Sequence, residues 1–432
     1  MAVKEKSRLR GLLLILVSLL LLAGAVFGYG WYDEHIDRSG WVMQADHYYY
    51  RDFHNHNVLG WQEINGHRYF FDETGIMQTG WLTQKDSTYF LDSDGTLVSG
   101  WFNHQGHRYH AGEDGILNTG LIEDSGKIYL LDSDGHLLTG LQDYEGNTYY
   151  LTEDGSAATG PVTLHKKNYY FGETGAMVSG WAEQEDGPHY YLEDGSMAYG
   201  FQEVEGKTYF LELDTGLPHK GWMQDGEYAY YFGEDGAALV GPQVIDGKKY
   251  HFTPKGIQVL LVNASNPIPD DYDPNLETLT GWHQISRIAL EPMRQMLREC
   301  KLAGKNPAIN SIYRSGKNQK LIMEDRIDQF IKDGMSPEEA AAKAATIVAA
   351  AGTSEHETGL SADLVGEEAK KWLAEHCWEF GFILRYPPEK GDITGITFEP
   401  WHFRYVGSRV SMDMKDSGLC LEEYLGAGPA KP

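Results

Sequence analysis

The chain has 432 residues, 41% of them hydrophobic, which suffices for packed cores and is too long for one ordinary domain. Its formal net charge of −27 argues against nucleic acid as a partner and leaves cationic ligands, neutral glycans and peptides open. The three cysteines do not form a disulfide scaffold, because one of them must stay unpaired within a monomer.

The N-terminal segment, residues 1–32, predicts export from the cytoplasm. Four basic residues lie ahead of an uncharged run from Gly11 to Tyr32, which is long enough to span a bilayer. Basic residues on this side place the rest of the chain outside the cytoplasm. The shorter core from Leu12 to Leu22, followed by small residues, also fits a cleavable signal peptide. Signal anchor and signal peptide both stay open, and both predict a surface protein.

The middle of the chain, residues 33–256, is a repeat array. Glycine recurs every 20 residues from Gly40 to Gly200, and one inserted residue shifts the phase before Gly221. Within a repeat, a tyrosine and then an acidic-glycine turn such as Asp94-Gly95 follow. Two short aromatic-rich segments separated by a glycine turn predict a β-hairpin. A 20-residue unit buries its apolar face only by stacking on its neighbours, so we expect a solenoid.

In the last part of the chain, residues 257–432, the glycine-turn repeats give way to mixed helix and strand patterns, which predict an α+β domain. Ser336-Pro337-Glu338-Glu339 is typical of a helix start, and the alanine-rich run from Ala340 to Ala350 predicts a helix. A second helix is predicted from Glu367 to Phe380, and strands from Ile309 to Tyr313 and from Thr397 to Val406.

Two segments of this domain carry the candidate chemistry. His356, Asp363 and His402 offer two imidazoles and a carboxylate, and catalytic zinc commonly takes three such ligands and a water. Glu399, three residues before His402, is a candidate base for that water, provided that a bend at Pro400 turns it inward. A turn followed by a strand would bring His356 and Asp363 to one point.

These segments resemble the VanY-type zinc D-alanyl-D-alanine carboxypeptidases of bacterial cell walls. That family carries S-x-H-x-x-G-x-x-x-D, matched here from Ser354 to Asp363, and E-x-W-H, matched by residues 399–402. A tyrosine-arginine-serine segment upstream is matched by residues 313–315, and the likeness covers the last third of the chain. Ser361 and Ala351 stand where the family more often has alanine and proline, and neither removes a catalytic group.

The resemblance implies a fold of the D-Ala-D-Ala carboxypeptidase and hedgehog-like type, with Zn²⁺ on His356, Asp363 and His402. It also implies that Glu399 and Arg314 are catalytic.

It further implies that Arg314 faces the scissile carbonyl or the substrate's terminal carboxylate, because guanidinium pairs bidentately with carboxylate. Ser354 and Gln319 would add hydrogen bonds to the same end of the substrate. The expected reaction removes the terminal D-alanine from peptidoglycan stem peptides. An L,D-carboxypeptidase acting on tetrapeptide stems, an endopeptidase acting on cross-bridges, and a wall-binding protein with an inactive peptidase domain remain open.

The repeat array resembles the cell-wall-binding repeats of Gram-positive surface proteins, which include choline-binding and glucan-binding modules. The resemblance implies a wall polymer, a choline-bearing teichoic acid or a glycan, as partner, with the protein at the cell wall or membrane of a Gram-positive bacterium. A passive spacer is the alternative. The candidate ligand-binding aromatics, which alternatively form only the solenoid core, are Trp41, Trp61, Trp81, Trp101, Trp181 and Trp222.

One departure concerns the second tryptophan that choline-binding repeats usually carry just before the tyrosine. Here that position is occupied by Arg68, Thr88, Arg108, Ile128, Thr148 and Asn168. We therefore expect the usual aromatic cage to lack a wall in these repeats.

Overall fold

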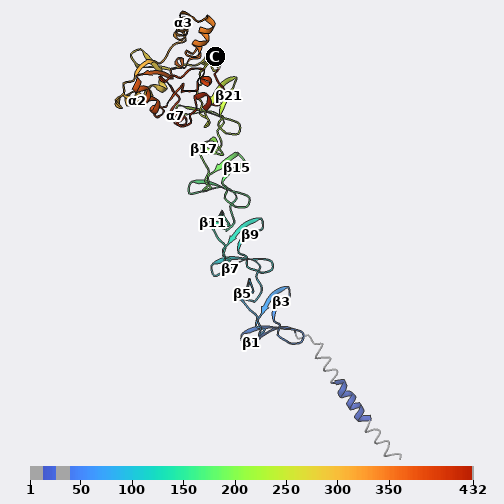
Figure 1. Cartoon of the computed structure of the whole chain (residues 1–432). Coiled ribbons are helices and arrows are strands. Elements are labelled where there is room, and N and C mark those ends of the chain that lie inside the picture. The colour runs from blue at the N-terminus through green and yellow to red at the C-terminus, as the bar shows by residue number, and fades with distance from the viewer. Residues whose placement is uncertain (1–12, 26–38, 431–432) are drawn as a thin grey trace, which may run out of the picture. The chain divides into compact units, whose positions relative to one another are not determined.

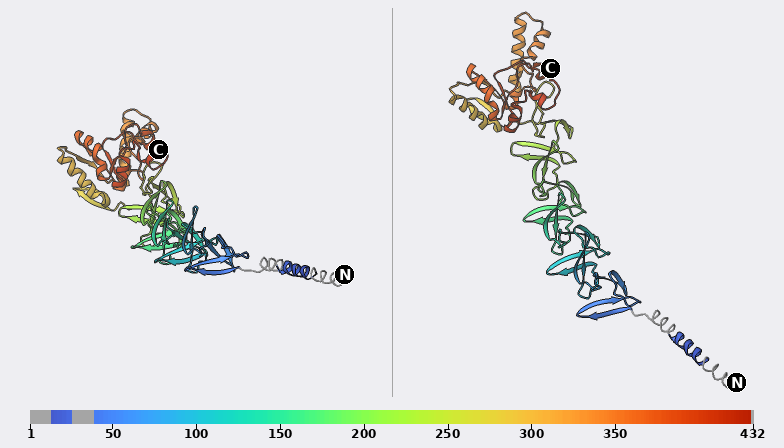
Figure 2. Two further views of the ribbon diagram at one scale, coloured as in Figure 1. Left: turned by 90° about the horizontal axis from the view of Figure 1, so that it is seen from below. Right: turned by 60° about the horizontal axis from the view of Figure 1, so that its bottom comes forward.

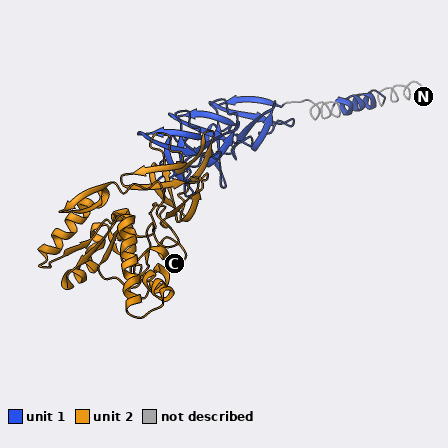
Figure 3. Cartoon of the chain, turned by 90° about the horizontal axis from the view of Figure 1, so that it is seen from above, with its two compact units in different colours: residues 1–180, 191–196 blue, residues 181–190, 197–432 orange. Residues whose placement is uncertain are grey.

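The computed structural model describes residues 13–25 and 39–430. The chain divides into two compact units, residues 1–180 with 191–196 and residues 181–190 with 197–432 (Figure 3). Of the predicted N-terminal anchor or signal peptide, residues 13–25 form a helix, and the rest of residues 1–32 lies outside the described residues. Within the described ranges, no helix is long and apolar enough to cross a membrane.

The first unit consists of two-stranded antiparallel hairpins that follow one another along the chain (Figures 1 and 2). Two-residue turns such as Asn65-Gly66, with φ angles of 54° and 82°, join the strands. Asparagine and glycine tolerate this left-handed backbone, which suits a tight hairpin. The predicted array of hairpins is confirmed. The strands of this unit are β1 (Gly40–Gln44), β2 (His47–Arg51), β3 (Gly60–Ile64), β4 (His67–Phe71), β5 (Gly80–Gln84), β6 (Ser87–Leu91), β7 (Gly100–His104), β8 (His107–Ala111), β9 (Gly120–Asp124), β10 (Lys127–Leu131), β11 (Gly140–Tyr144), β12 (Asn147–Leu151), β13 (Gly160–Leu164) and β14 (Lys167–Phe171).

Each of the six candidate tryptophans joins two neighbouring hairpins. Trp61 packs edge-on against Phe70 of its own hairpin and Tyr89 of the next, with ring centroids 5.2 and 4.9 Å apart. The other five make the same contacts with rings nine and 28 residues later. The tryptophans therefore contribute to hairpin stacking in each unit, whatever else they bind.

The second unit continues the hairpins and ends in an α+β domain, as predicted. Its hairpin strands are β15 (Gly180–Gln184, whose first residue belongs to the first unit), β16 (Gly187–Tyr191, likewise shared), β17 (Gly200–Val204), β18 (Lys207–Leu211), β19 (Gly221–Asp225), β20 (Tyr228–Phe232), β21 (Gly241–Ile245), β22 (Lys248–Phe252), β23 (Leu276–Thr280) and β24 (His283–Ser286).

An antiparallel four-stranded sheet in the order β25-β26-β28-β27 forms the centre of the α+β domain. Its strands are β25 (Ala308–Ser311), β26 (Ser361–Val365), β27 (Phe382–Leu384) and β28 (His402–Tyr405). Buried side chains of the sheet, such as Leu364 and Phe403, form a core with Met293 and Leu373. The helices are α2 (Arg287–Leu302), α3 (Gly316–Lys332), α4 (Pro337–Ala345), α5 (Glu367–His376), α6 (Gly391–Thr394), α7 (Ser408–Met414) and α8 (Leu421–Tyr424), with 3₁₀ turns η1 (Glu355–Thr358) and η2 (Cys377–Phe380).

Four predicted elements are shorter than expected. The strand predicted from Ile309 to Tyr313 ends at Ser311, and the helix predicted from Glu367 to Phe380 is α-helical to His376 and then forms a 3₁₀ turn. Helix α4 starts at the predicted capping box of Ser336 and Glu339 but ends at Ala345 instead of Ala350. The predicted strand from Thr397 to Val406 is wrong in its first half, because proline at position 400 lacks a ladder N–H and the chain turns there before β28. Helices α2 and α3 were not predicted.

The division between the two units falls upstream of the predicted domain boundary at residue 256. Tyr228, Tyr230 and Phe232 of β20 are buried in one core with Val410 and Leu425 of the α+β domain. Polar contacts cross the same surface and join Tyr405 to Glu227 at 2.8 Å and Arg409 to Asp225 at 2.7 Å. The last hairpins therefore share their packing with the α+β domain.

Candidate metal centre

The register of the sheet brings two of the proposed ligands together. Asp363 in β26 lies directly opposite His402 in β28, and on its other side opposite Ser311 in β25. Opposite residues of an antiparallel pair are close neighbours on one face of a sheet. Their proximity is therefore a property of strand pairing and needs no unusual backbone.

His356 reaches the same point from the turn η1, which precedes β26. Gly359 ends this turn at φ 71°, and a Cβ there would lie 2.8 Å from Leu276 and 3.0 Å from the amide nitrogen of Ser286. Glycine is thus needed at this position, both for the left-handed backbone and for the close approach. The spacing of six residues between His356 and Asp363 corresponds to a turn and the start of a strand.

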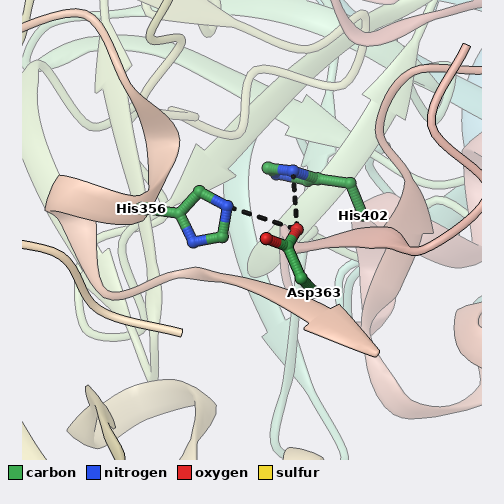
Figure 4. A group of neighbouring side chains, drawn as sticks. All are labelled: His356, Asp363 and His402. Carbon is green, nitrogen blue, oxygen red and sulfur yellow. Dashed lines mark ion pairs between the residues drawn. The ribbon is translucent and has the colours of Figure 1, made fainter. Parts of the chain in front are cut away.

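The imidazoles of His356 and His402 both lie close to one carboxylate oxygen of Asp363 (Figure 4). Oδ1 of Asp363 lies 3.3 Å from Nε2 of His356 and 3.3 Å from Nδ1 of His402. All three residues are buried, and neither Nε2 of His356 nor Oδ1 of Asp363 has a hydrogen-bond partner among the described residues. Buried polar atoms normally find partners, so this pair of unsatisfied atoms indicates a place for a bound group.

The other nitrogen of His356 fixes its tautomer. Nδ1 lies 2.6 Å from the carbonyl oxygen of Ile312, a distance at which it donates its proton. Nε2 then carries the lone pair, which is the arrangement found in metal-binding histidines. Burial lowers the pKa of His356 more than the neighbouring Asp363 raises it, so the imidazole is neutral and ready to bind a metal.

Asp363 and His402 carry opposite charges when no metal is bound. Burial alone would raise the pKa of Asp363, but the two imidazoles outweigh it and hold the pKa well below its usual range. Burial alone would lower the pKa of His402, but the nearby carboxylates of Asp363, Glu355 and Glu399 raise it well above its usual value. Without a metal, the site is therefore held together by an imidazolium among carboxylates.

Glu399 lies beside this cluster on the turn before β28. Its Oε2 is 3.2 Å from Nδ1 of His402, and its side chain is 13% exposed. The amide nitrogen of Glu399 donates to the carbonyl oxygen of Tyr386, which fixes the turn. The bend at Pro400 that the sequence required for an inward-facing glutamate is present.

Arg314 lies beside Asp363 and is held by three acceptors. Its Nε donates to Ser311 Oγ, its Nη1 to Gln319 Oε1 and its Nη2 to Asp363 Oδ2, at 3.0, 2.9 and 3.2 Å. A guanidinium has five N–H groups, so two remain free on the terminal nitrogens. Gln319 is almost fully buried and also donates to the carbonyl oxygen of Ala349 at 2.7 Å.

A cavity of about 490 Å³ connects these groups. It is lined by all seven of the predicted catalytic, substrate-binding and metal-ligating residues, Arg314, Gln319, Ser354, His356, Asp363, Glu399 and His402. Trp401 also lines it, as does Tyr386, which the sequence had not singled out. Burial and the nearby Glu355 raise the pKa of Tyr386 well above its usual value, so its hydroxyl keeps its proton.

A network of four buried charged residues lies next to the site and was not predicted from the sequence. Its members are Glu355, Arg385, Arg404 and Glu422. Glu355 accepts hydrogen bonds from Arg385 Nε and Arg404 Nη1, each at 2.8 Å, and its Oε2 lies 3.8 Å from Nε2 of His402. Arg385 also forms a bidentate pair with Glu422, at 2.9 and 2.6 Å. Glu355 lies inside the motif from Ser354 to Asp363, but residue type alone predicts a charged side chain on the surface.

The predicted wall-binding tryptophans lie outside this centre, on the hairpins. Trp41, Trp61, Trp81 and Trp101 belong to the first unit, and Trp181 and Trp222 to the second. Their environments differ from one hairpin to another.

Comparisons with known proteins agree with this organisation. The family model described as D-alanyl-D-alanine carboxypeptidase, VanY, matches residues 282–408, and the choline-binding repeat matches residues 58–102 and 138–180. A D-alanyl-D-alanine carboxypeptidase of Enterococcus faecalis is 42% identical over 175 residues, which are 39% of this chain and 65% of that protein's length.

Two further relatives match nearly their whole length. The bifunctional D-Ala-D-Ala dipeptidase and D-Ala-D-Ala carboxypeptidase VanXYC of Enterococcus gallinarum is 31% identical, over 38% of this chain and 91% of its own. A solved structure of a mutant D,D-pentapeptidase VanY from a VanB-type resistance cassette, in complex with Zn(II), is 40% identical over 38% of this chain and 97% of its own, with a TM-score of 0.38. Through its second unit, the chain belongs to the VanY family of D-alanyl-D-alanine carboxypeptidases.

Proposed function

We propose that the protein is a zinc-dependent D-alanyl-D-alanine carboxypeptidase that removes the terminal D-alanine from peptidoglycan stem peptides and is held at the cell wall by its hairpin repeats. The observation that carries the proposal is the buried meeting of His356, Asp363 and His402 beside Glu399. Membership of the family supports the reaction, although the chain spans only 65% of the length of the first relatives.

The donor set fits zinc. Two ligands about 2.05 Å from a tetrahedral ion lie about 3.3 Å apart. This is the separation of Asp363 Oδ1 from His356 Nε2 and from His402 Nδ1. Imidazole nitrogen and carboxylate oxygen are both ordinary zinc ligands, and a set of three leaves a fourth position for water. The proposed ligands are therefore His356 Nε2, Asp363 Oδ1 and His402 Nδ1.

Zinc held at this point supplies a Lewis acid and lowers the pKa of a bound water. Glu399 then has the role of proton carrier. Its carboxylate takes a proton from the attacking water and passes it to the nitrogen of the departing D-alanine. With its side chain at 13% exposure and its backbone fixed to Tyr386, Glu399 is positioned for this transfer at the wall of the cavity.

Arg314 is proposed to bind the substrate's terminal carboxylate or the scissile carbonyl. Its two free N–H groups match the spacing of two carboxylate oxygens. Since Gln319 accepts from Arg314 and donates to the main chain, we propose that it holds the guanidinium in place. Ser354 is buried, lines the same cavity and makes no capping hydrogen bond, so its hydroxyl is proposed to donate to the substrate.

We also propose a location for the protein at the cell wall. The match to choline-binding repeats supports attachment to a wall polymer, either a choline-bearing teichoic acid or a glycan. We propose that residues 1–32 direct export and hold the protein at the membrane or are removed on the way. The intact mass of the protein recovered from cell walls and membranes separates these cases, because cleavage after Ala25 shortens the chain by 25 residues.

Mass spectrometry of synthetic muropeptides tests the proposed reaction. Pentapeptides ending in D-Ala-D-Ala and tetrapeptides ending in L-Lys-D-Ala are incubated with the zinc-loaded chain and with Glu399→Gln as control. Loss of one D-alanine from the pentapeptide alone supports the proposal. Loss from the tetrapeptide alone makes the enzyme an L,D-carboxypeptidase. If cross-linked dimers are cut while neither monomer changes, the enzyme is an endopeptidase, and no cleavage at all indicates an inactive domain.

A further inference from the structure

The six candidate tryptophans fall into two groups by exposure. Four of them, Trp41, Trp81, Trp181 and Trp222, are 39–42% exposed. The other two, Trp61 and Trp101, are less exposed. All six make the same edge-on contacts within and between hairpins, so hairpin stacking does not explain the difference.

A guanidinium lies over each of the two less exposed rings. The Cζ atom of Arg68 lies 4.9 Å from the ring centroid of Trp61, and that of Arg108 lies 4.5 Å from the centroid of Trp101. No other candidate tryptophan of the described hairpins has a cationic side chain of the chain itself over its ring.

Strand register makes this contact a fixed feature of the hairpin. In the pair β3–β4, Trp61 lies opposite Phe70 and Glu63 opposite Arg68, so Trp61 and Arg68 are diagonal neighbours on one face. Diagonal neighbours are within reach of long and aromatic side chains. In the pair β5–β6 the same diagonal joins Trp81 to Thr88, whose side chain is too short to cover an indole.

Further contacts hold the two arginine–tryptophan pairs in place. Arg68 Nη1 donates to the carbonyl oxygen of Asp114 at 2.9 Å, and Trp101 Nε1 donates to Asp124 Oδ2 at 2.9 Å. Arg108 forms no ion pair with any residue that the structure describes, although the chain has 63 acidic residues. Its attractive partner is therefore the ring, through the negative face that an indole presents to a cation.

We propose that Arg68 and Arg108 close the ring faces of Trp61 and Trp101 to quaternary ammonium groups, so that a choline-bearing polymer engages the repeats only through uncovered tryptophans. A quaternary ammonium binds to the same ring face by the same cation–π attraction, and it would have to displace the guanidinium against the repulsion of two like charges. The inference rests on the proposed function of the hairpins as wall-binding repeats and specifies which of them take this ligand.

Equilibrium dialysis with choline counts the sites directly. The full chain is kept in a non-ionic detergent, because detergents with quaternary ammonium headgroups would compete. Arg108→Thr is expected to bind one choline more per chain than the unaltered protein, and Thr88→Arg one fewer. The two variants are matched, because each places at the diagonal position the residue found in the neighbouring hairpin. Equal numbers for all three proteins, or no choline bound by the unaltered protein, overturn the inference.

Sedimentation with isolated cell walls separates this outcome from a failure of the proposed function. If the unaltered chain sediments with walls but binds no choline, the repeats recognise another wall component, and only the inference fails. If the chain does not sediment with walls at all, the proposed role of the repeats fails as well. The thermal unfolding midpoint of each variant should match that of the unaltered chain, which shows that the count reflects ligand sites and not misfolding.

Discussion

The α+β domain is expected to depend on hairpins that lie outside its predicted boundary at residue 256. A chain that starts at residue 257 lacks Tyr228, Tyr230 and Phe232, which are 8%, 4% and 1% exposed and share a core with Val410 and Leu425. Burial of one such side chain stabilises a fold by about 1.5–3 kcal/mol, so the loss of three costs about 5–9 kcal/mol. A whole domain is stable by only about 5–15 kcal/mol.

Urea denaturation followed by circular dichroism compares residues 257–432 with residues 200–432. The longer chain should unfold cooperatively, and the shorter one should lose most of its stability or show no cooperative transition. The cut before residue 200 leaves β20 in place, whereas the cut before residue 257 removes it, so the comparison reports on the shared core. Free energies of unfolding within about 1 kcal/mol of one another would refute the reasoning.

Point variants in the longer chain refine the comparison. Tyr228→Ala removes a buried ring that also contacts Ser408 at 3.0 Å and lies 4.6 Å from the guanidinium carbon of Arg409. It should cost about 3–5 kcal/mol, as large-to-small changes in a core do. Leu302→Ala, at a side chain that is 73% exposed, should change stability by less than about 0.5 kcal/mol.

Glu399→Gln should lower kcat on a D-Ala-D-Ala pentapeptide about 10²–10⁴-fold, because the general base is lost. The variant should still bind one zinc per chain, because Glu399 is not a metal ligand. Loss of zinc would instead place Glu399 among the ligands. Glu355→Gln should lower the free energy of unfolding by about 3–5 kcal/mol, since it removes the negative charge that the buried Arg385 and Arg404 share. The same variant should weaken zinc binding about 10–100-fold in a competition titration, and an unchanged affinity would show that Glu355 does not support His402. Zinc uptake near pH 7 should release about one proton per ion, because the raised pKa of His402 keeps it protonated in the metal-free chain and a ligand must be deprotonated. Zinc affinity should therefore rise with pH, and an indicator dye that detects no proton release would contradict the assigned charge.

The clustering of His356, Asp363 and His402 could be predicted, because these residues lie in short segments with simple backbone geometry. His356 and Asp363 are separated by one turn and the start of one strand, and Asp363 and His402 face each other across two paired strands. The hairpins were likewise predictable, since their period and their glycine turns are local features of the sequence.

The buried charge network could not be predicted, because its stability depends on partners that are distant in the sequence. Arg385 pairs with Glu355 and Glu422, which are 30 and 37 residues away. A lone charged residue is expected on the surface, and only the assembled fold shows that each charge is neutralised inside.

Helices α2 and α3 were not predicted from the sequence for two other reasons. Helix α2 carries Pro292 inside it, which a local reading takes as a break. Helix α3 buries only Gln319, so its pattern lacks the apolar stripe that marks a packed helix.

The most direct test of the account measures free D-alanine released from a D-Ala-D-Ala pentapeptide by the full chain, first after chelation and then during stepwise return of zinc. The account predicts that release stops on chelation and recovers fully at one zinc per chain. It also predicts that Asp363→Ala, which removes the carboxylate shared by both histidines, does not recover at that ratio. Release that survives chelation, or no release with one zinc bound, would contradict the assignment of His356, Asp363 and His402 as the catalytic metal centre.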